Sequence, residues 1–106
     1  MAIFNQAASR KKYVKPCDFT KKIKEITATN DTQTWVANKD CWLELYAYQG
    51  SGKEAYIKIN GEIIMGGSTA TNKTLVPNVY VTRGSVIELY SSSTSASATM
   101  TAYGCL

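Results

Sequence analysis

From Thr34 onward the chain consists of short stretches in which apolar and polar residues alternate. In residues 42–48, Leu43, Leu45 and Ala47 alternate with aromatic or charged side chains. A period of two places successive side chains on opposite faces of a β-strand. With turn residues between the stretches, the pattern predicts about six strands of a sandwich or barrel. The other predicted strands cover residues 56–59, 62–65, 75–81, 86–90 and 98–103.

The clearest local signal is a hairpin centred on Asn60 and Gly61. These two residues separate the predicted strands 56–59 and 62–65. Asn-Gly supplies the two positive-φ positions of a type I′ turn, so we expect a two-residue hairpin here. Pro77 lies in another predicted strand and favours either a sheet edge or the start of the strand, because proline cannot donate to the ladder.

The first third of the chain fits two interpretations. Phe19, Ile23 and Ile26 have helical spacing, whereas residues 23–28 also fit a strand with lysines facing water. We favour a strand from Ile23, because it would complete the sheets. The segment before Pro16 offers few apolar residues to bury and is interpreted as an extended arm. A chain of 106 residues has the size of one domain, so we expect a basic arm over residues 1–22 and an all-β domain over residues 23–106.

Parity within the predicted strands divides their side chains into two sets. The inner set is aliphatic and comprises Leu43, Leu45, Ile57, Ile59, Ile64, Ile87 and Leu89. The outer set is also largely apolar, which is unusual for the solvent face of a monomer and typical of an interface. We therefore predict an oligomer interface on the outer set, although β-bulges would shift parity and singly exposed tyrosines are ordinary. The predicted interface residues are Trp42, Tyr46, Tyr48, Tyr56, Ile63, Met65 and Tyr90.

The net charge of +4 is concentrated at the start of the chain. Residues 1–24 carry seven basic residues against Asp18, whereas residues 25–106 carry five basic and seven acidic residues. A basic arm on a near-neutral body can attach electrostatically to an acidic surface, or it can be a solvated terminus. The predicted attachment residues are Arg10, Lys11, Lys12 and Lys15.

The same charge distribution disfavours nucleic acid as a partner. A single-strand groove needs cations and stacking aromatics together, whereas the lysines here lie in the arm and most tyrosines in the body. No run approaches the roughly 18 apolar residues of a membrane span, and no secretory signal pattern is present, so we expect no membrane association.

Residues that carry catalysis or hold metals are sparse. The chain has no histidine, so Ser-His and Cys-His pairs are excluded. A carboxylate pair could form if Glu44 and Glu88 lay on neighbouring strands, but a solvated sheet face is the favoured interpretation. The cysteines, which show no CxxC spacing, are interpreted as structural thiols rather than a zinc site; they are Cys17, Cys41 and Cys105. We expect neither enzymatic activity nor a cofactor.

The order of turn motifs resembles that of jelly-roll domains in bacteriophage fibre and tail proteins. Residues 35–42 resemble the opening of these domains, in which an aromatic, a small residue and a turn precede Asp-Gly and a second aromatic. The similarity covers roughly residues 33–106, and it departs from the pattern at Cys41, where glycine is usual, and at Ser85, where aspartate is usual. The later matching segments are the Ile-Asn-Gly hairpin at 56–61, Val-Pro within 75–77, the segment 81–87 and the closing strand 99–104.

This resemblance implies an antiparallel jelly-roll β-sandwich similar to the trimeric tumour-necrosis-factor and C1q type. It further implies a homotrimeric structural component of a virion, such as a head-fibre, decoration or tail-associated protein, assembled in the bacterial host cytoplasm. Other virion proteins would then be the partners of the arm. The alternative is a carbohydrate- or receptor-binding module at a fibre tip, for which Trp35, Asn38 and Asp40 are the candidate residues and a host-surface glycan the candidate ligand.

Overall fold

The computed structural model describes residues 14–49, 52–66 and 72–106 and shows an all-β protein. These residues form no helix, so the described part of the chain has no helix that could cross a membrane. Eight strands follow one another along the described chain. They are β1 (Cys17–Ala28), β2 (Thr32–Val36), β3 (Cys41–Gln49), β4 (Ala55–Ile59), β5 (Glu62–Gly66), β6 (Asn72–Val81), β7 (Val86–Ser91) and β8 (Ser97–Cys105).

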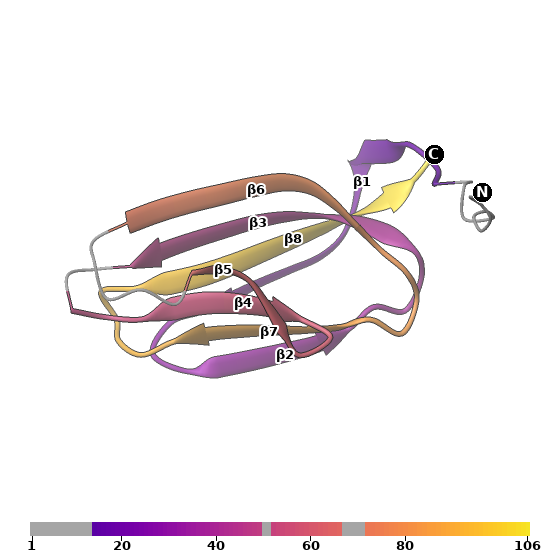
Figure 1. Ribbon diagram of the computed structural model, residues 1–106. Helices are drawn as coiled ribbons and strands as arrows, with labels where there is room; N and C mark the ends of the chain where they lie inside the picture. Colours follow the sequence, from indigo (N-terminus) through magenta and orange to yellow (C-terminus); the bar gives the residue numbers. More distant parts are fainter. Residues whose placement is uncertain (1–13, 50–51, 67–71) are drawn as a thin grey trace, which may run out of the picture.

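The strands form two four-stranded antiparallel sheets that lie one above the other (Figure 1). Sheet A has the order β1-β8-β3-β6, and sheet B has the order β2-β7-β4-β5. The first and last strands of the described chain are neighbours in sheet A, with β8 between β1 and β3. As predicted for a strand that contains Pro77, β6 lies at a sheet edge.

The core fills the space between the sheets and follows the predicted alternation. Every second residue of β3 is buried, including Leu43, Leu45 and Ala47. From sheet B, Ile57, Ile87 and Leu89 contribute buried side chains to the same cluster, while Ile59 packs against it partly buried. Period-two patterning therefore identified these inward side chains of β3, β4 and β7.

The hairpin predicted between β4 and β5 is confirmed. Asn60 and Gly61 both have positive φ, at 52° and 84°, as a type I′ turn requires. Asn60 also binds β7, because its backbone N–H donates to Val86 O at 2.8 Å and its Oδ1 accepts from Val86 N at 2.9 Å. The turn is thus attached to the neighbouring strand of sheet B.

A β-bulge in β5 makes the predicted parity of that strand wrong. Lys58 pairs with Ile63 and Ile57 with Met65, so Ile64 is the extra residue on β5. Met65, predicted to face outward as an interface residue, is 5% exposed and belongs to the core. Ile64, predicted to face inward, is 39% exposed.

The N-terminal strand begins earlier than predicted. β1 starts at Cys17 rather than Ile23 and pairs with β8. The helical interpretation of this segment is wrong, and the predicted boundary at residue 22 falls inside a strand. Residues 1–13 lie outside the described part of the chain.

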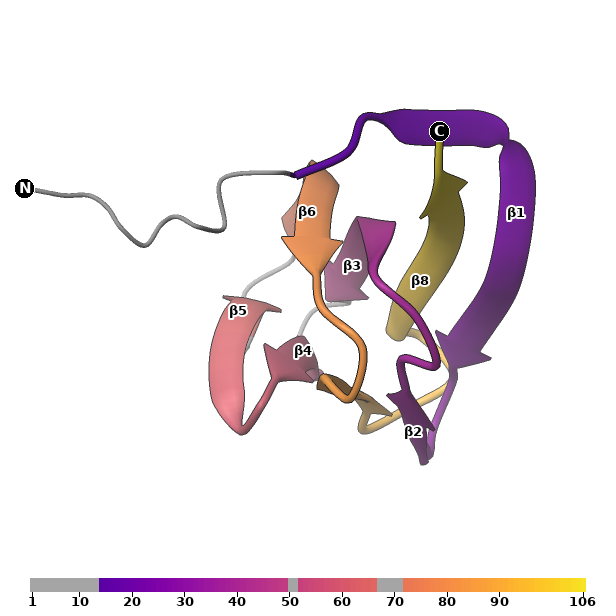
Figure 2. The ribbon, with the colours of Figure 1, turned by 90° about the vertical axis from the view of Figure 1, so that its right-hand side faces the viewer.

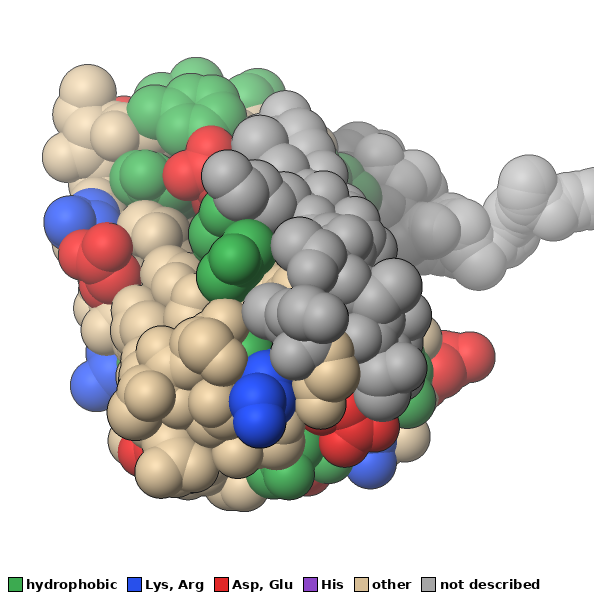
Figure 3. All heavy atoms as spheres, turned by 90° about the vertical axis from the view of Figure 1, so that its left-hand side faces the viewer, with side chains coloured by type: hydrophobic (Ala, Val, Ile, Leu, Met, Phe, Trp, Pro, Cys, Tyr) green, Lys and Arg blue, Asp and Glu red, His purple; other side chains and the backbone are tan. Residues whose placement is uncertain are grey.

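The two ends of the sandwich differ in the connections and side chains that lie there. Figure 2 looks onto the end where the β2–β3 and β6–β7 connections pass, close to the start of β1 and the end of β8. Figure 3 looks onto the opposite end, where charged side chains of both signs are scattered over a mostly uncharged surface. Lys53, in the connection between β3 and β4, is exposed.

Candidate interaction surfaces

The predicted interface residues lie on two opposite faces of the molecule. Trp42, Tyr46 and Tyr48 come from β3 and lie on the outer side of sheet A, each half-buried. Tyr56 and Tyr90 lie on the outer side of sheet B. Parity predicts whether a side chain faces in or out, but it cannot tell which sheet the strand joins. One flat contact could therefore not cover all of these residues.

Four aromatic side chains cross the outer side of sheet A, one from each strand. We call them the aromatic row. Phe19 and Tyr103 meet edge to face with ring centroids 5.3 Å apart, and Trp42 and Tyr80 do so at 5.2 Å. Tyr103 pairs with Trp42 in the β3–β8 register, which joins the two contacts. Such cross-strand aromatic pairs stabilise a sheet, and here they leave Phe19 59% exposed.

The chain before β1 is attached to this row. The indole Nε1 of Trp42 donates a hydrogen bond to Lys15 O at 2.7 Å. Next to it, Leu106 N donates to Pro16 O at 2.9 Å. The Lys15 side chain is exposed, so this predicted attachment residue lies where the chain leaves the sandwich. The other three attachment residues, Arg10, Lys11 and Lys12, lie outside the described residues.

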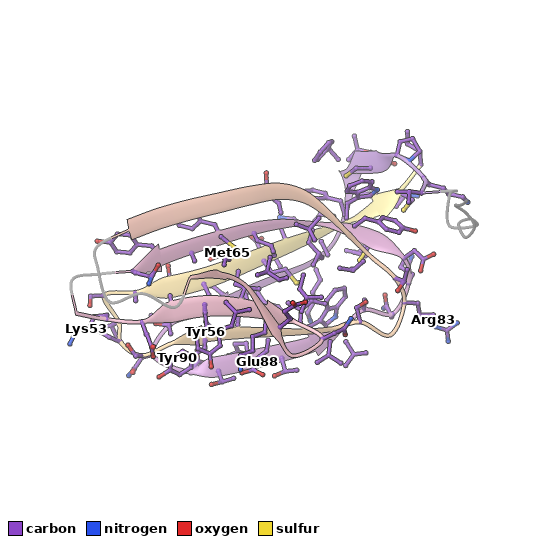
Figure 4. All side chains as sticks on the ribbon, viewed as in Figure 1. Lys53, Tyr56, Met65, Arg83, Glu88 and Tyr90 are labelled. Carbon is purple, nitrogen blue, oxygen red and sulfur yellow. The ribbon has the colours of Figure 1, made fainter. Side chains whose placement is uncertain are left out.

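On sheet B the outer face carries a smaller cluster. Tyr56 and Tyr90 stack with centroids 4.9 Å apart and an interplanar angle of 27°, and Lys58 Nζ lies 5.1 Å from the centre of the Tyr56 ring. Figure 4 shows Tyr56, Glu88 and Tyr90 directed away from sheet A, whereas Met65 lies between the layers. Ile63 adds an exposed aliphatic side chain to this face.

The carboxylate pair considered for Glu44 and Glu88 does not form. Glu44 lies in β3 of sheet A and Glu88 in β7 of sheet B, so the two side chains face opposite sides of the molecule. Glu88 pairs instead with Lys58 in the β4–β7 register.

The candidate carbohydrate-binding residues separate into two groups. Trp35 packs against the core from β2. Asn38 and Asp40 lie in the β2–β3 connection and line a cavity at the end of the sandwich shown in Figure 2. The sequence placed these two residues in a turn but could not indicate which other segments meet them.

The cysteines, which are distant in sequence, converge at this same end. The β1–β8 register places Cys17 opposite Cys105, and the Cys105 thiol donates to Asp40 O at 3.7 Å, beside Cys41. All three thiols are free. Burial raises the pKa of Cys41 to about 11, and it also raises the pKa of Cys17. Both groups are therefore neutral thiols rather than nucleophilic thiolates at neutral pH.

No group of three or more potential metal ligands occurs among the described residues. The Tyr80 hydroxyl interacts with Asp40, and partial burial together with this carboxylate raises the pKa of Tyr80. A scan against protein-family models and searches of curated proteins and of solved structures found no match to this chain.

Proposed function

We propose that the protein is a structural component of a bacteriophage virion, with a jelly-roll body that self-associates as a trimer and an N-terminal arm that attaches it to another virion protein. The phage setting comes from the turn motifs shared with phage fibre and tail domains over roughly residues 33–106. The fold and the outer aromatic side chains support the structural role.

The strand order supports the jelly-roll interpretation. A jelly roll has eight antiparallel strands in two facing sheets. In this chain the connections pass from one sheet to the other at every step except the β4–β5 hairpin. This alternation places β8 beside β1 in one sheet and β7 beside β2 in the other, so successive strands wrap around the core from both ends of the chain.

The aromatic row is the observation that carries self-association. The aromatic row has one ring on each strand of sheet A, in two contacting pairs that the Trp42–Tyr103 register places side by side. Tyr46 and Tyr48 lie further along β3. Tyrosine and tryptophan are enriched at protein interfaces, because their large rings become buried there while their polar tips keep a hydrogen-bond partner. The outer face of sheet B carries a smaller aromatic cluster and a cation–π contact. Sheet A is therefore the proposed subunit contact.

The oligomeric state tests this proposal by analytical ultracentrifugation at about 10 μM, a concentration at which interfaces of ordinary size hold together. We expect a trimer for the natural sequence and dissociation in Tyr46→Glu, because a buried carboxylate without a partner opposes association. Tyr90→Glu, on the opposite face, is the matched control and should remain a trimer. A monomeric natural sequence, or dissociation in the control alone, contradicts the assignment.

The arm is tested by two deletions. Residues 1–13 precede every described strand. Their removal should leave the trimer and its melting temperature almost unchanged, but it should abolish incorporation into the virion. Removal of residues 1–22 also deletes the start of β1 and should destabilise the fold. If the shorter deletion assembles normally, the attachment site lies on the sandwich instead.

A carbohydrate- or receptor-binding tip is the second candidate, and one observation favours it. Asn38 and Asp40 meet at a cavity, and amide and carboxylate groups commonly bind sugar hydroxyls. A glycan array with the purified protein separates the two functions. Reproducible binding that Asn38→Ala removes would favour the tip, whereas a negative array together with a trimer would favour the structural role.

A further inference from the structure

A cavity of about 440 Å³ opens at the end of the sandwich shown in Figure 2. It lies where the β2–β3 and β6–β7 connections meet the start of β1 and the end of β8. This volume is within the range of small-molecule sites. Its lining comes from four separate parts of the chain: Lys15 and Lys21, Asn38 to Asp40, Tyr80 and Arg83, and Gly104 to Leu106.

One wall of the cavity is fixed by hydrogen bonds between the two connections. Ala37 N donates to Ser85 O at 2.9 Å, and Gly84 N donates to Ala37 O at 2.8 Å. Arg83 N donates to the Asp40 carboxylate at 2.8 Å. Because these bonds join backbone to backbone or to a short side chain, the backbone of Arg83 and the Asp40 carboxylate are held in a defined relative position. A ligand would not need to order the backbone of this wall on binding.

The opposite wall is formed by the paired ends of β1 and β8. Lys21 Nζ donates to Cys105 O at 3.3 Å, and Leu106 N donates to Pro16 O at 2.9 Å. The alkyl chain of Lys21 lies over Gly104, where an added Cβ would come within 2.6 Å of Lys21 Cδ. The absence of a side chain at this position thus allows Lys21 to lie along the cavity.

The cavity is strongly cationic. Lys15, Lys21, Lys39 and Arg83 line it against one carboxylate, that of Asp40. Even if an α-carboxylate at Leu106 is counted, two positive charges remain in excess. The Asp40 side chain is already bound by Arg83 N and interacts with the Tyr80 hydroxyl. In the described part of the chain, the ion pair is between Lys22 and Glu25. None of the four cationic side chains of the cavity lies within 4 Å of a carboxylate oxygen in that part.

We infer that this cavity binds a small ligand through a phosphate group. An excess of several positive charges matches the two negative charges that a phosphate can carry better than it matches a single carboxylate. Arg83 offers a planar donor fork suited to phosphate oxygens, and the lysines add point charges. Asn38 and the remaining volume leave room for an organic group attached to the phosphate. This inference does not depend on the trimer or on the virion role.

Titration of the isotope-labelled full chain, followed by NMR amide shifts, tests the site with three probes: inorganic phosphate, glucose 6-phosphate and glucose. Both phosphates should shift the amides around Asn38 and Arg83 saturably, with weaker binding at higher salt, and glucose should not. Tighter binding of glucose 6-phosphate supports the site with an organic phosphate as its ligand. Equal affinities support it with the free ion as its ligand.

Two variants and a matched control separate a built site from diffuse attraction. Arg83→Gln and Lys39→Gln should each weaken phosphate binding about tenfold, the scale of one lost charged hydrogen bond. Lys53→Gln removes the same charge from the opposite end of the sandwich and should leave the affinity unchanged (Figure 4). Lys39, Lys53 and Arg83 are all exposed, so the fold should tolerate their replacement.

Three results would overturn the inference. The first is that neither phosphate shifts any amide at the cavity at about 10 mM, where even a millimolar ligand binds. The second is that Lys53→Gln weakens binding as much as Arg83→Gln. The third is that a glutamate-rich peptide binds at the cavity while both phosphates do not, which would assign the surface to an acidic protein partner.

Discussion

The indole Nε1 of Trp42 donates a hydrogen bond of 2.7 Å to the backbone carbonyl oxygen of Lys15. This contact joins the aromatic row of sheet A to the chain before β1. Trp42→Phe keeps an aromatic ring in the row but removes the donor. We expect a loss of about 1 kcal/mol in the free energy of unfolding and faster proteolysis next to Lys15. Tyr46→Phe, on the same strand and face, is the control. Unchanged cleavage in Trp42→Phe would show that the contact does not hold this segment.

The bulge in β5 predicts opposite effects at adjacent residues. Met65→Ala should cost about 2–5 kcal/mol of stability, because its side chain is buried between the sheets. Ile64→Ala should cost far less, since that side chain is 39% exposed. Urea denaturation measures both. A larger loss in Ile64→Ala would mean that the strand follows simple alternation and that the register is wrong.

Two glycines with positive φ separate backbone strain from steric conflict. Gly61→Ala meets no atom within 4 Å and should cost about 1–2 kcal/mol, the penalty for a left-handed L-residue. Gly66→Ala adds a Cβ that collides with the carbonyl oxygen of Ala55, so roughly 1–3 kcal/mol more is expected. Thermal unfolding of both variants gives the difference directly. Equal losses would show that β4 can move away from β5 without cost.

Stability should fall as the solution becomes alkaline. Burial raises the pKa of Cys41 from 9.0 to about 11, so between these values the folded chain retains a proton that the unfolded chain releases. The free energy of unfolding therefore decreases as pH rises through this window. The pKa values of Cys17 and Tyr80 are also raised and act in the same direction.

Urea denaturation from about pH 8 to about pH 11 measures this dependence. Cys41→Ala should flatten the slope, because it removes the group whose pKa is raised to about 11. A slope of the same size in Cys41→Ala would assign the effect to the other titrating groups.

The direction of side chains was predictable in strands that carry no extra residue of their own. In β3 the alternation of Leu43, Leu45 and Ala47 holds without interruption, so period two identified the buried face. In β5 the single extra residue, Ile64, reverses the parity of Met65. Nothing in the apolar sequence of residues 63–65 marks a bulge, because all three candidates for the extra position are apolar side chains of similar size.

The candidate sites depend on strand order, which local patterns do not contain. Tyr103 and Trp42 are paired only because β8 lies beside β3. Cys17 and Cys105 face each other for the same kind of reason, although 87 residues separate them in the chain. Sequence patterns identified outward aromatic residues and a turn at Asn38 to Asp40, but the aromatic row and the cationic cavity arise from pairing between distant strands.

The position of β8 between β1 and β3 also determines when sheet A can close during translation. Until β8 leaves the ribosome, β1 has no neighbour in its sheet and one edge of β3 stays open. Unpaired strand edges on nascent chains pair readily with other copies. Ribosomes that translate one message would thus hold unfinished sheets close together, and the emergence of β8 from each ribosome would be the step that removes these exposed edges.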